Sequence, residues 1–172
     1  MPLWGTLISL SQNGNIILGL ADIPALDERY IGHEKKAYKI VNGKKTKLKI
    51  RDNNKISDAV LNTTSPYLFA NKNDQLSFER LSKKVKLTRL GGDCYSYCLL
   101  ADGHVDIVVE SGLNSWDIRA LEPIIINAGG VLKTWENKKI FDGGRIIACT
   151  NNKIFNQCRG ILNKKNPSKN KT

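Results

Sequence analysis

The chain has 172 residues, of which 41% are hydrophobic and 25% charged, and its formal net charge is +11. This length and composition predict a globular protein of one domain, or one and a half, with a sizeable core. No apolar run approaches the roughly 20 residues of a membrane span, and the N-terminus lacks a signal-peptide pattern, so we expect a cytoplasmic protein without membrane contact. Lysine far outnumbers arginine and is spread over predicted turns, which favours a solvated basic surface over a nucleic-acid site.

The first fifty residues predict antiparallel strands. Two apolar runs flank the turn at 13–14, where Asn-Gly is a strong hairpin signal. Short strands are expected at 30–32 and 37–40, and the basic stretch 44–55 predicts a loop between subdomains. No predicted element covers the apolar surface of these strands. We therefore interpret residues 1–50 as the remnant of an incomplete antiparallel sheet whose other parts are missing ahead of this chain.

From residue 56 onward, predicted strands alternate with predicted helices. The strands are expected at 59–64, 86–90, 105–110, 131–135 and 146–150, and the helices at 74–84 with Asn73 as cap, 93–101, 117–128 and 151–162. This alternation predicts an α/β domain over 56–162 with a mainly parallel sheet. The remaining residues, 163–172, are rich in lysine and asparagine and predict a disordered basic tail.

The four cysteines, Cys94, Cys98, Cys149 and Cys158, contain no C-x-x-C pair. We expect buried or half-buried free thiols in a reducing compartment, where disulfides are rare. A zinc site from Cys94, Cys98 and His104 would have a spacing that matches no common zinc module.

Three acidic residues are predicted at one edge of the α/β sheet. Asp93 follows a predicted strand, Glu110 ends the next one, and Asp117 begins a helix. Ligands of open α/β sheets bind at the carboxyl ends of the strands, where such acids suit Mg²⁺ and a polar substrate. A simple helix cap is an equally open interpretation of Asp117. Arg89 could meet a phosphate beside the pair Gly91–Gly92, although that pair is more typical of a tight turn.

The segment 91–130, with G-D-C-Y near its start and W-D followed by A-G-G at its end, resembles the C-terminal signature of the inositol monophosphatase superfamily. G-D-C-Y, T-T-S-P and P-L-W-G-T-L are most similar to its histidinol-phosphatase branch. The resemblance covers nearly all of residues 2–162. It implies the C-terminal part of a layered α/β sandwich with two sheets. It also implies a Mg²⁺-dependent phosphatase acting on a small phosphate monoester, with histidinol phosphate, in histidine biosynthesis, ahead of an inositol phosphate.

The same resemblance implies roles for four residues. Asp117 matches a metal ligand, Asp93 and Glu110 match residues that contact the organic part of the substrate, and Arg89 would lie near the substrate. Acids suit histidinol phosphate because its organic part carries an ammonium. The family's D-P-I-D-G-T metal core, which precedes the stretch resembled by P-L-W-G-T-L, does not occur in this sequence. One carboxylate cannot organise the metal cluster, so no catalytic residue is assigned and this chain alone is expected to have little or no activity.

Two other classes of function stay open. The chain could be a non-catalytic remnant that associates with itself as a homo-oligomer or with a separate N-terminal half, because an exposed sheet edge and apolar face favour pairing. A basic nucleic-acid-binding module is the third interpretation, which the scattered lysines disfavour.

Overall fold

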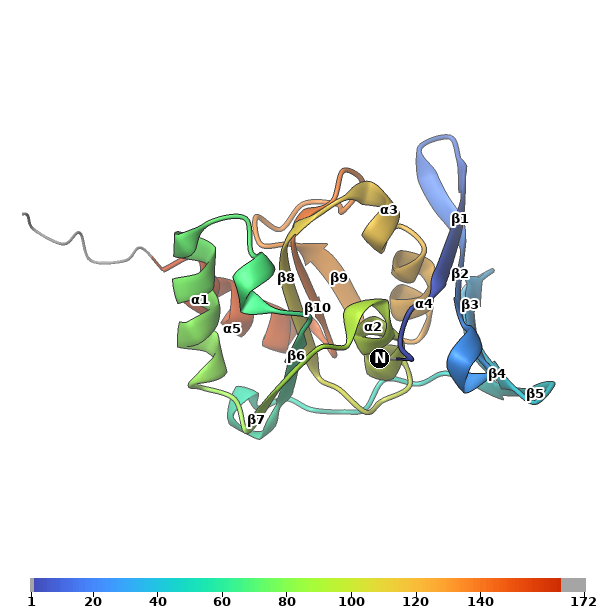
Figure 1. The fold of residues 1–172 in the computed structure, drawn as a ribbon, viewed down its shortest axis with the longest axis horizontal. Coiled ribbons are helices and arrows are strands. Elements are labelled where there is room, and N and C mark those ends of the chain that lie inside the picture. The colour runs from blue at the N-terminus through green and yellow to red at the C-terminus, as the bar shows by residue number, and fades with distance from the viewer. Residues whose placement is uncertain (1, 165–172) are drawn as a thin grey trace, which may run out of the picture.

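The computed structural model describes residues 2–164, which form four layers (Figure 1). A pair of helices, α1 and α5, packs on one face of a mixed sheet, and α2 and α4 pack on the other face. A second, antiparallel sheet then covers α4 on its far side. This arrangement confirms the predicted layered α/β fold with two sheets. None of the described helices is long and apolar enough to cross a membrane.

The antiparallel sheet has five strands in sequence order, beginning with the predicted hairpin at residues 13–14. The strands are β1 (Thr6–Gln12), β2 (Asn15–Ile23), β3 (Glu28–His33), β4 (Lys36–Val41) and β5 (Lys44–Lys47). The prediction of a loop over 44–55 is therefore wrong for β5. The Asn42–Gly43 turn, with φ of 47° and 73°, folds the chain back so that β5 pairs with β4. Its lysines are exposed at the sheet edge, which is where charged strands are tolerated.

The second sheet has the order β7-β6-β8-β10-β9. Its strands are β6 (Val60–Thr63), β7 (Leu87–Leu90), β8 (Ile107–Leu113), β9 (Val131–Thr134) and β10 (Gly144–Cys149). β6 runs parallel to β7 and β8, but β10 is antiparallel to both β8 and β9. β6, β7, β8 and β9 therefore run in the same direction, as the predicted mainly parallel sheet requires, and β10 is the strand that opposes them. The link from β9 to β10 contains no helix, so the chain returns as a hairpin and not through the crossover that a parallel pair requires.

In the described part of the chain, five α-helices connect and cover these strands: α1 (Lys72–Ser82), α2 (Asp93–Ala101), α3 (Ser115–Ile118), α4 (Leu121–Asn127) and α5 (Asn152–Leu162). Short 3₁₀ turns occupy Pro24–Leu26, Ile56–Asp58 and Pro66–Leu68. Asn71, and not Asn73, caps α1, since its side chain accepts from the Asp74 amide at 3.0 Å. The helix predicted over 117–128 is split into α3 and α4. Pro123 lacks an amide hydrogen and fits only the first turn of a helix, so a new helix starts shortly before it.

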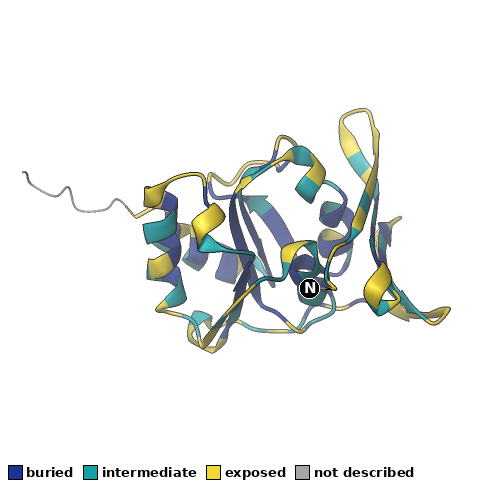
Figure 2. Cartoon of the chain, viewed as in Figure 1, coloured by how far each residue is buried: buried dark blue, intermediate teal, exposed yellow. Residues whose placement is uncertain are grey.

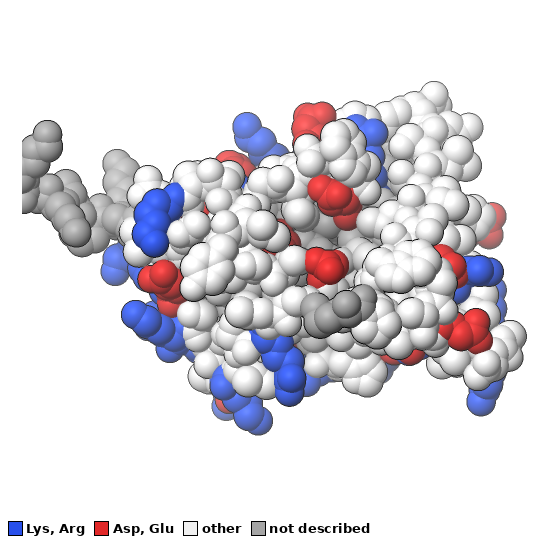
Figure 3. Space-filling model, in the orientation of Figure 1, with Lys and Arg blue, Asp and Glu red and all other residues white. Residues whose placement is uncertain are grey.

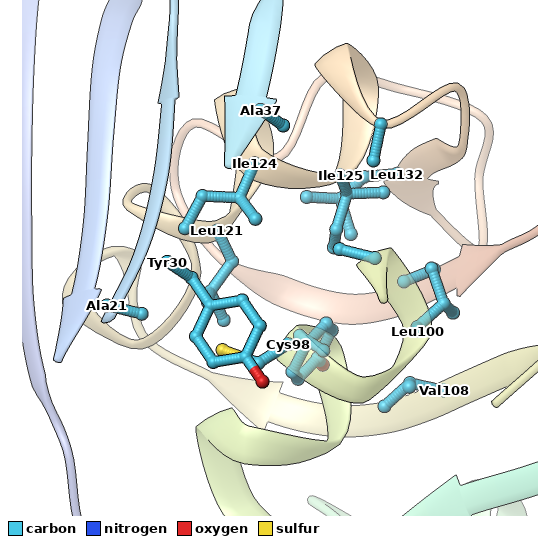
Figure 4. Packing of buried hydrophobic residues seen from close by; sticks show 14 of the residues in the cluster. Ala21, Tyr30, Ala37, Cys98, Leu100, Val108, Leu121, Ile124, Ile125 and Leu132 are labelled. Atoms are coloured by element: carbon cyan, nitrogen blue, oxygen red, sulfur yellow. The ribbon is translucent and has the colours of Figure 1, made fainter. Parts of the chain in front are cut away.

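Two hydrophobic clusters lie on opposite faces of the mixed sheet. The larger one joins both sheets: Figure 4 shows side chains from β2–β4 (Ala21, Tyr30, Ala37), α2 (Cys98, Leu100) and α4 (Leu121, Ile124, Ile125). The backbone at the start of α4 rests directly on β2 and β3. A Cβ at Gly19 would lie 1.9 Å from the Ala120 carbonyl oxygen, and a Cβ at Gly32 would lie 2.3 Å from the Ile124 amide nitrogen. α4 thus covers the inner face of the antiparallel sheet, for which the sequence predicted no cover.

The outer part of the antiparallel sheet is much more exposed than the mixed sheet (Figure 2). Trp4 is 61% exposed, and Ile8 and Leu10 of β1 are 54% and 55% exposed. The second cluster, around Trp135 and Phe155, fills the space between the mixed sheet and α1 and α5. All four cysteines are free, with Cys94 partly buried and the other three buried, which confirms the predicted thiols. The predicted disordered tail lies outside the described residues except for its first two.

Candidate functional site

A pocket of about 500 Å³ contains all three predicted acids, Asp93, Glu110 and Asp117, together with Tyr97 and Thr64. The acids come from α2, β8 and α3, which are separate elements in the sequence. Figure 3 shows acidic side chains around a hollow in the middle of one face, with Lys and Arg mainly toward its edges. A second pocket of about 470 Å³, between the turn of the β1–β2 hairpin and α4, contains none of the predicted site residues.

Asp93 reaches the pocket through a tight turn. Gly91 has a φ of 84°, and its amide donates to the carbonyl oxygens of Thr63 and Thr64 at 3.1 and 2.9 Å. A Cβ at Gly92 would lie 2.0 Å from the Ser96 hydroxyl, so a larger residue there would require that hydroxyl to move. Asp93 itself has a φ of 43°, a left-handed conformation that aspartate adopts more readily than most residues. The turn interpretation of the glycine pair is confirmed, and its consequence is an exposed carboxylate at the start of α2.

Glu110 is only 4% exposed and is held by two donors. The Thr64 amide donates to Oε1 at 2.6 Å, and the Thr63 hydroxyl donates to Oε2 at 3.0 Å. Burial raises the pKa of Glu110, these hydrogen bonds oppose the rise, and the charge of Asp93 adds to it. Glu110 does not end its strand as predicted: β8 continues to Leu113, which pairs with Gly144 across a register shift.

Asp117 has two features that sequence reasoning held as alternatives. It caps its helix, because its Oδ2 accepts from the Asn114 amide at 2.8 Å and the Asn114 side chain accepts in return from the Asp117 amide. This reciprocal capping box confirms the cap interpretation. Its carboxylate is also partly exposed to the pocket, and Oδ1 takes no part in the cap. The cap therefore orients the carboxylate without using both of its oxygens.

Arg89 lies apart from the three acids. It is an exposed residue of the edge strand β7 and is not among the residues that line the acidic pocket. Sequence reasoning missed Tyr97, which lines the pocket from α2. The spacing could have found it, because Tyr97 lies four residues after Asp93 and so on the same face of one helix.

The described part of the chain does not make a magnesium site by itself. Within residues 2–164, no three His, Cys, Asp or Glu side chains come together as metal ligands. Asp117 offers one carboxylate oxygen, whereas Mg²⁺ requires octahedral oxygen coordination. Within the same residues, Cys94, Cys98 and His104 form no zinc cluster.

The sequence model of the inositol monophosphatase family matches residues 1–166. The chain belongs to the inositol monophosphatase family. This confirms the predicted family.

Curated relatives of the chain are phosphatases. It is 45% identical over 143 residues to the chloroplastic bifunctional phosphatase IMPL2 of Arabidopsis thaliana, which is 80% of this chain and 39% of that protein. It is 30% identical over 152 residues to the histidinol-phosphatase of Chlorobaculum parvum, covering 88% and 58%. Among solved structures, an inositol monophosphatase from Zymomonas mobilis matches with a TM-score of 0.87 and 35% identity, over 94% of this chain and 63% of that one. The chain spans less than two thirds of the length of each.

Proposed function

We propose that this chain is the substrate-recognising part of a Mg²⁺-dependent phosphatase whose substrate is histidinol phosphate. The observation that carries the proposal is the convergence of Asp93, Glu110 and Asp117 on one pocket. Asp93 and Glu110 would contact the organic part of the substrate, and Asp117 would be one ligand of the metal.

The charge of the pocket supports a cationic substrate. Its lining has three carboxylates and, among the described residues, no Lys, Arg or His, although the whole chain carries a formal charge of +11. Opposite charges a few ångströms apart attract each other strongly in a partly buried site. Histidinol phosphate carries an ammonium group, whereas an inositol phosphate carries no positive charge. The lining therefore favours the amine-bearing ester over the inositol ester.

The described residues supply one proposed metal ligand, so we propose that this chain binds the organic part of the ester without hydrolysing it. Bound Mg²⁺ would supply the charge that polarises the phosphate in a complete site. Arg89 is proposed to contact the phosphate, although it lies outside the pocket lining.

The first test measures the binding of L-histidinol and of myo-inositol to the purified chain by NMR titration. We expect L-histidinol to bind and myo-inositol not to bind. Asp93→Asn should weaken L-histidinol binding, whereas Asp58→Asn, at an exposed acid outside the pocket, should leave it unchanged. Preferential binding of myo-inositol would refute the proposed substrate.

The second test is phosphate release from histidinol phosphate with Mg²⁺. We expect background rates from this chain, and a rate within tenfold of a complete relative would refute the proposed inactivity. Arg89→Ala, compared with the exposed Arg159→Ala, checks the proposed phosphate contact through the affinity for inorganic phosphate. Equal affinities in the two variants would remove Arg89 from the site.

A specific observation also favours association with a protein partner. The apolar side chains of Trp4, Ile8 and Leu10 are more than half exposed, and β1 is an edge strand. Exposed apolar residues on an open edge are typical of a surface that another chain covers. We propose that this face pairs with a second copy of the chain or with a separate N-terminal half. Light scattering after size exclusion would contradict self-association if it gave a monomer mass up to about 100 μM.

A further inference from the structure

The hydroxyl of Tyr97 is one of a few buried side-chain atoms without a hydrogen-bond partner among the described residues, and it lies on a residue that lines the acidic pocket. Tyr97 is 3% exposed, and its hydroxyl has no hydrogen-bond partner among the described residues. Buried polar groups in native proteins are nearly always hydrogen-bonded, so an unpaired one calls for an explanation. Tyr97 also lines the acidic pocket, where a bound molecule could provide the missing partner.

Neighbouring tyrosines show that the fold normally provides a partner. The Tyr95 hydroxyl, on the same helix, donates to Glu28 Oε2 at 2.9 Å. The Tyr30 hydroxyl donates to the same oxygen at 2.6 Å. Tyr97 therefore differs from both in having a hydroxyl that no other described residue pairs with.

The nearby carboxylates are engaged elsewhere. The two oxygens of Glu110 accept from Thr64 and Thr63, and the Oδ2 of Asp117 accepts from Asn114. Burial raises the pKa of Tyr97 well above its ordinary value, and the charges of Glu110 and Asp117 raise it further. The phenol thus stays protonated and can both donate a hydrogen bond and accept one.

We propose that the Tyr97 hydroxyl hydrogen-bonds the organic part of an amine-bearing substrate and so determines specificity together with Asp93 and Glu110. The inference rests on the proposed function, since it concerns the same pocket. Carboxylates attract a cation from any direction. A hydroxyl fixed on a helix, in contrast, can hydrogen-bond only a ligand that places a polar atom within hydrogen-bond distance of it. A site with a buried hydroxyl discriminates against ligands that leave this group unpaired.

The test uses Tyr97→Phe and the matched control Tyr95→Phe in the full chain, each removing one hydroxyl from α2. L-histidinol and myo-inositol affinities are measured by NMR titration, and melting temperatures by circular dichroism. Tyr97→Phe should weaken L-histidinol binding about fivefold to tenfold, the value of one neutral hydrogen bond. Its melting temperature should equal or exceed that of wild type, because no intramolecular hydrogen bond is lost. Tyr95→Phe should keep the L-histidinol affinity within about twofold and melt at a lower temperature.

Three results would overturn the inference, and they have different consequences. If wild type binds L-histidinol and Tyr97→Phe binds it equally well, the role of Tyr97 is refuted while the proposed function stands. If Tyr97→Phe melts well below wild type, the hydroxyl is a structural group and not a ligand contact. If wild type does not bind L-histidinol, the proposed substrate and the role of Tyr97 are refuted together.

Discussion

Replacing Glu110 with glutamine tests whether a buried carboxylate in the pocket lowers the stability of the fold. Glutamine has the same shape, and its amide oxygen can accept from the Thr64 amide as Oε1 does at 2.6 Å. The Thr63 hydroxyl, 3.0 Å from Oε2, can rotate and accept from the amide nitrogen. The substitution therefore keeps both hydrogen bonds and removes the charge and the titration.

The sign of the pH dependence follows from the raised pKa of Glu110. Below pH 4.5, its ordinary pKa, the carboxyl is protonated in both the folded and the unfolded chain, so it contributes no difference. As the pH rises from there to the folded pKa, the unfolded chain ionises first and the free energy of unfolding falls, by about 1.4 kcal/mol per unit of elevation. Glutamine does not titrate, so the free energy of unfolding of Glu110→Gln does not fall in this way as the pH rises. Its stability relative to wild type should therefore increase between pH 4 and pH 7.

The assay is urea unfolding at pH 4 and pH 7, followed by circular dichroism. Glu79→Gln, at an exposed position of α1, is the control and should show a smaller pH-dependent difference from wild type. Glu110→Ala removes both acceptors and should cost about 2–6 kcal/mol at either pH, because two buried donors lose their partner. The opposite result would be a free energy of unfolding for Glu110→Gln that falls further below the wild-type value at pH 7 than at pH 4. The ionised carboxylate would then stabilise the fold, and the reasoning from the raised pKa would be wrong.

Four further substitutions, of which Gly160→Ala is a control, test the fold and the role of Asp117. Gly32→Ala places a Cβ 2.3 Å from the backbone of α4 and should lower the free energy of unfolding by at least about 2 kcal/mol. Gly160→Ala places a Cβ with no atom within 4 Å and should raise the free energy of unfolding by about 0.5–1 kcal/mol. Asp106→Ala removes a fully buried carboxylate that pairs with Arg51, and should cost about 3–5 kcal/mol in urea unfolding. Asp117→Asn keeps an oxygen for the cap, so the unfolding free energy should change by less than about 1 kcal/mol. Because one carboxylate does not make a metal site, Mn²⁺ binding measured by EPR should stay at the nonspecific level in both wild type and Asp117→Asn.

Local signals were sufficient for most elements of the fold. The Asn-Gly turn predicts the first hairpin because it requires a positive φ at both positions, which residues 13 and 14 have at 51° and 72°. The helix over 93–101 is bounded by a glycine pair before it and by Asp102–Gly103 after it, and α2 has those bounds. The meeting of Asp93, Glu110 and Asp117 was predictable because the ends of β7 and β8 lie at one edge of the sheet.

Features that depend on distant residues were not predictable from local patterns. The direction of β10 is set by the hairpin return from β9 and by a pairing with β8 that spans some forty residues of sequence. β5 has the composition of a loop and becomes a strand only because β4 offers it an open edge. The position of Tyr97 was readable from helical spacing, but its unpaired hydroxyl depends on which donors and acceptors surround it in space. Contacts of this kind have no one-dimensional signature.

Three locally unfavourable features coincide in the acidic pocket, and they support the proposed site independently of any relative. Asp93 has a left-handed backbone, Glu110 is a buried carboxyl with a raised pKa, and Tyr97 has a buried hydroxyl without a partner among residues 2–164. Each feature costs stability, and such costs persist in native proteins mainly where binding or catalysis requires the group. The net charge of +11 points the opposite way, toward an anionic partner. The arrangement of groups within one pocket is the stronger guide, because a ligand interacts with the groups beside it and distant surface lysines are screened by salt.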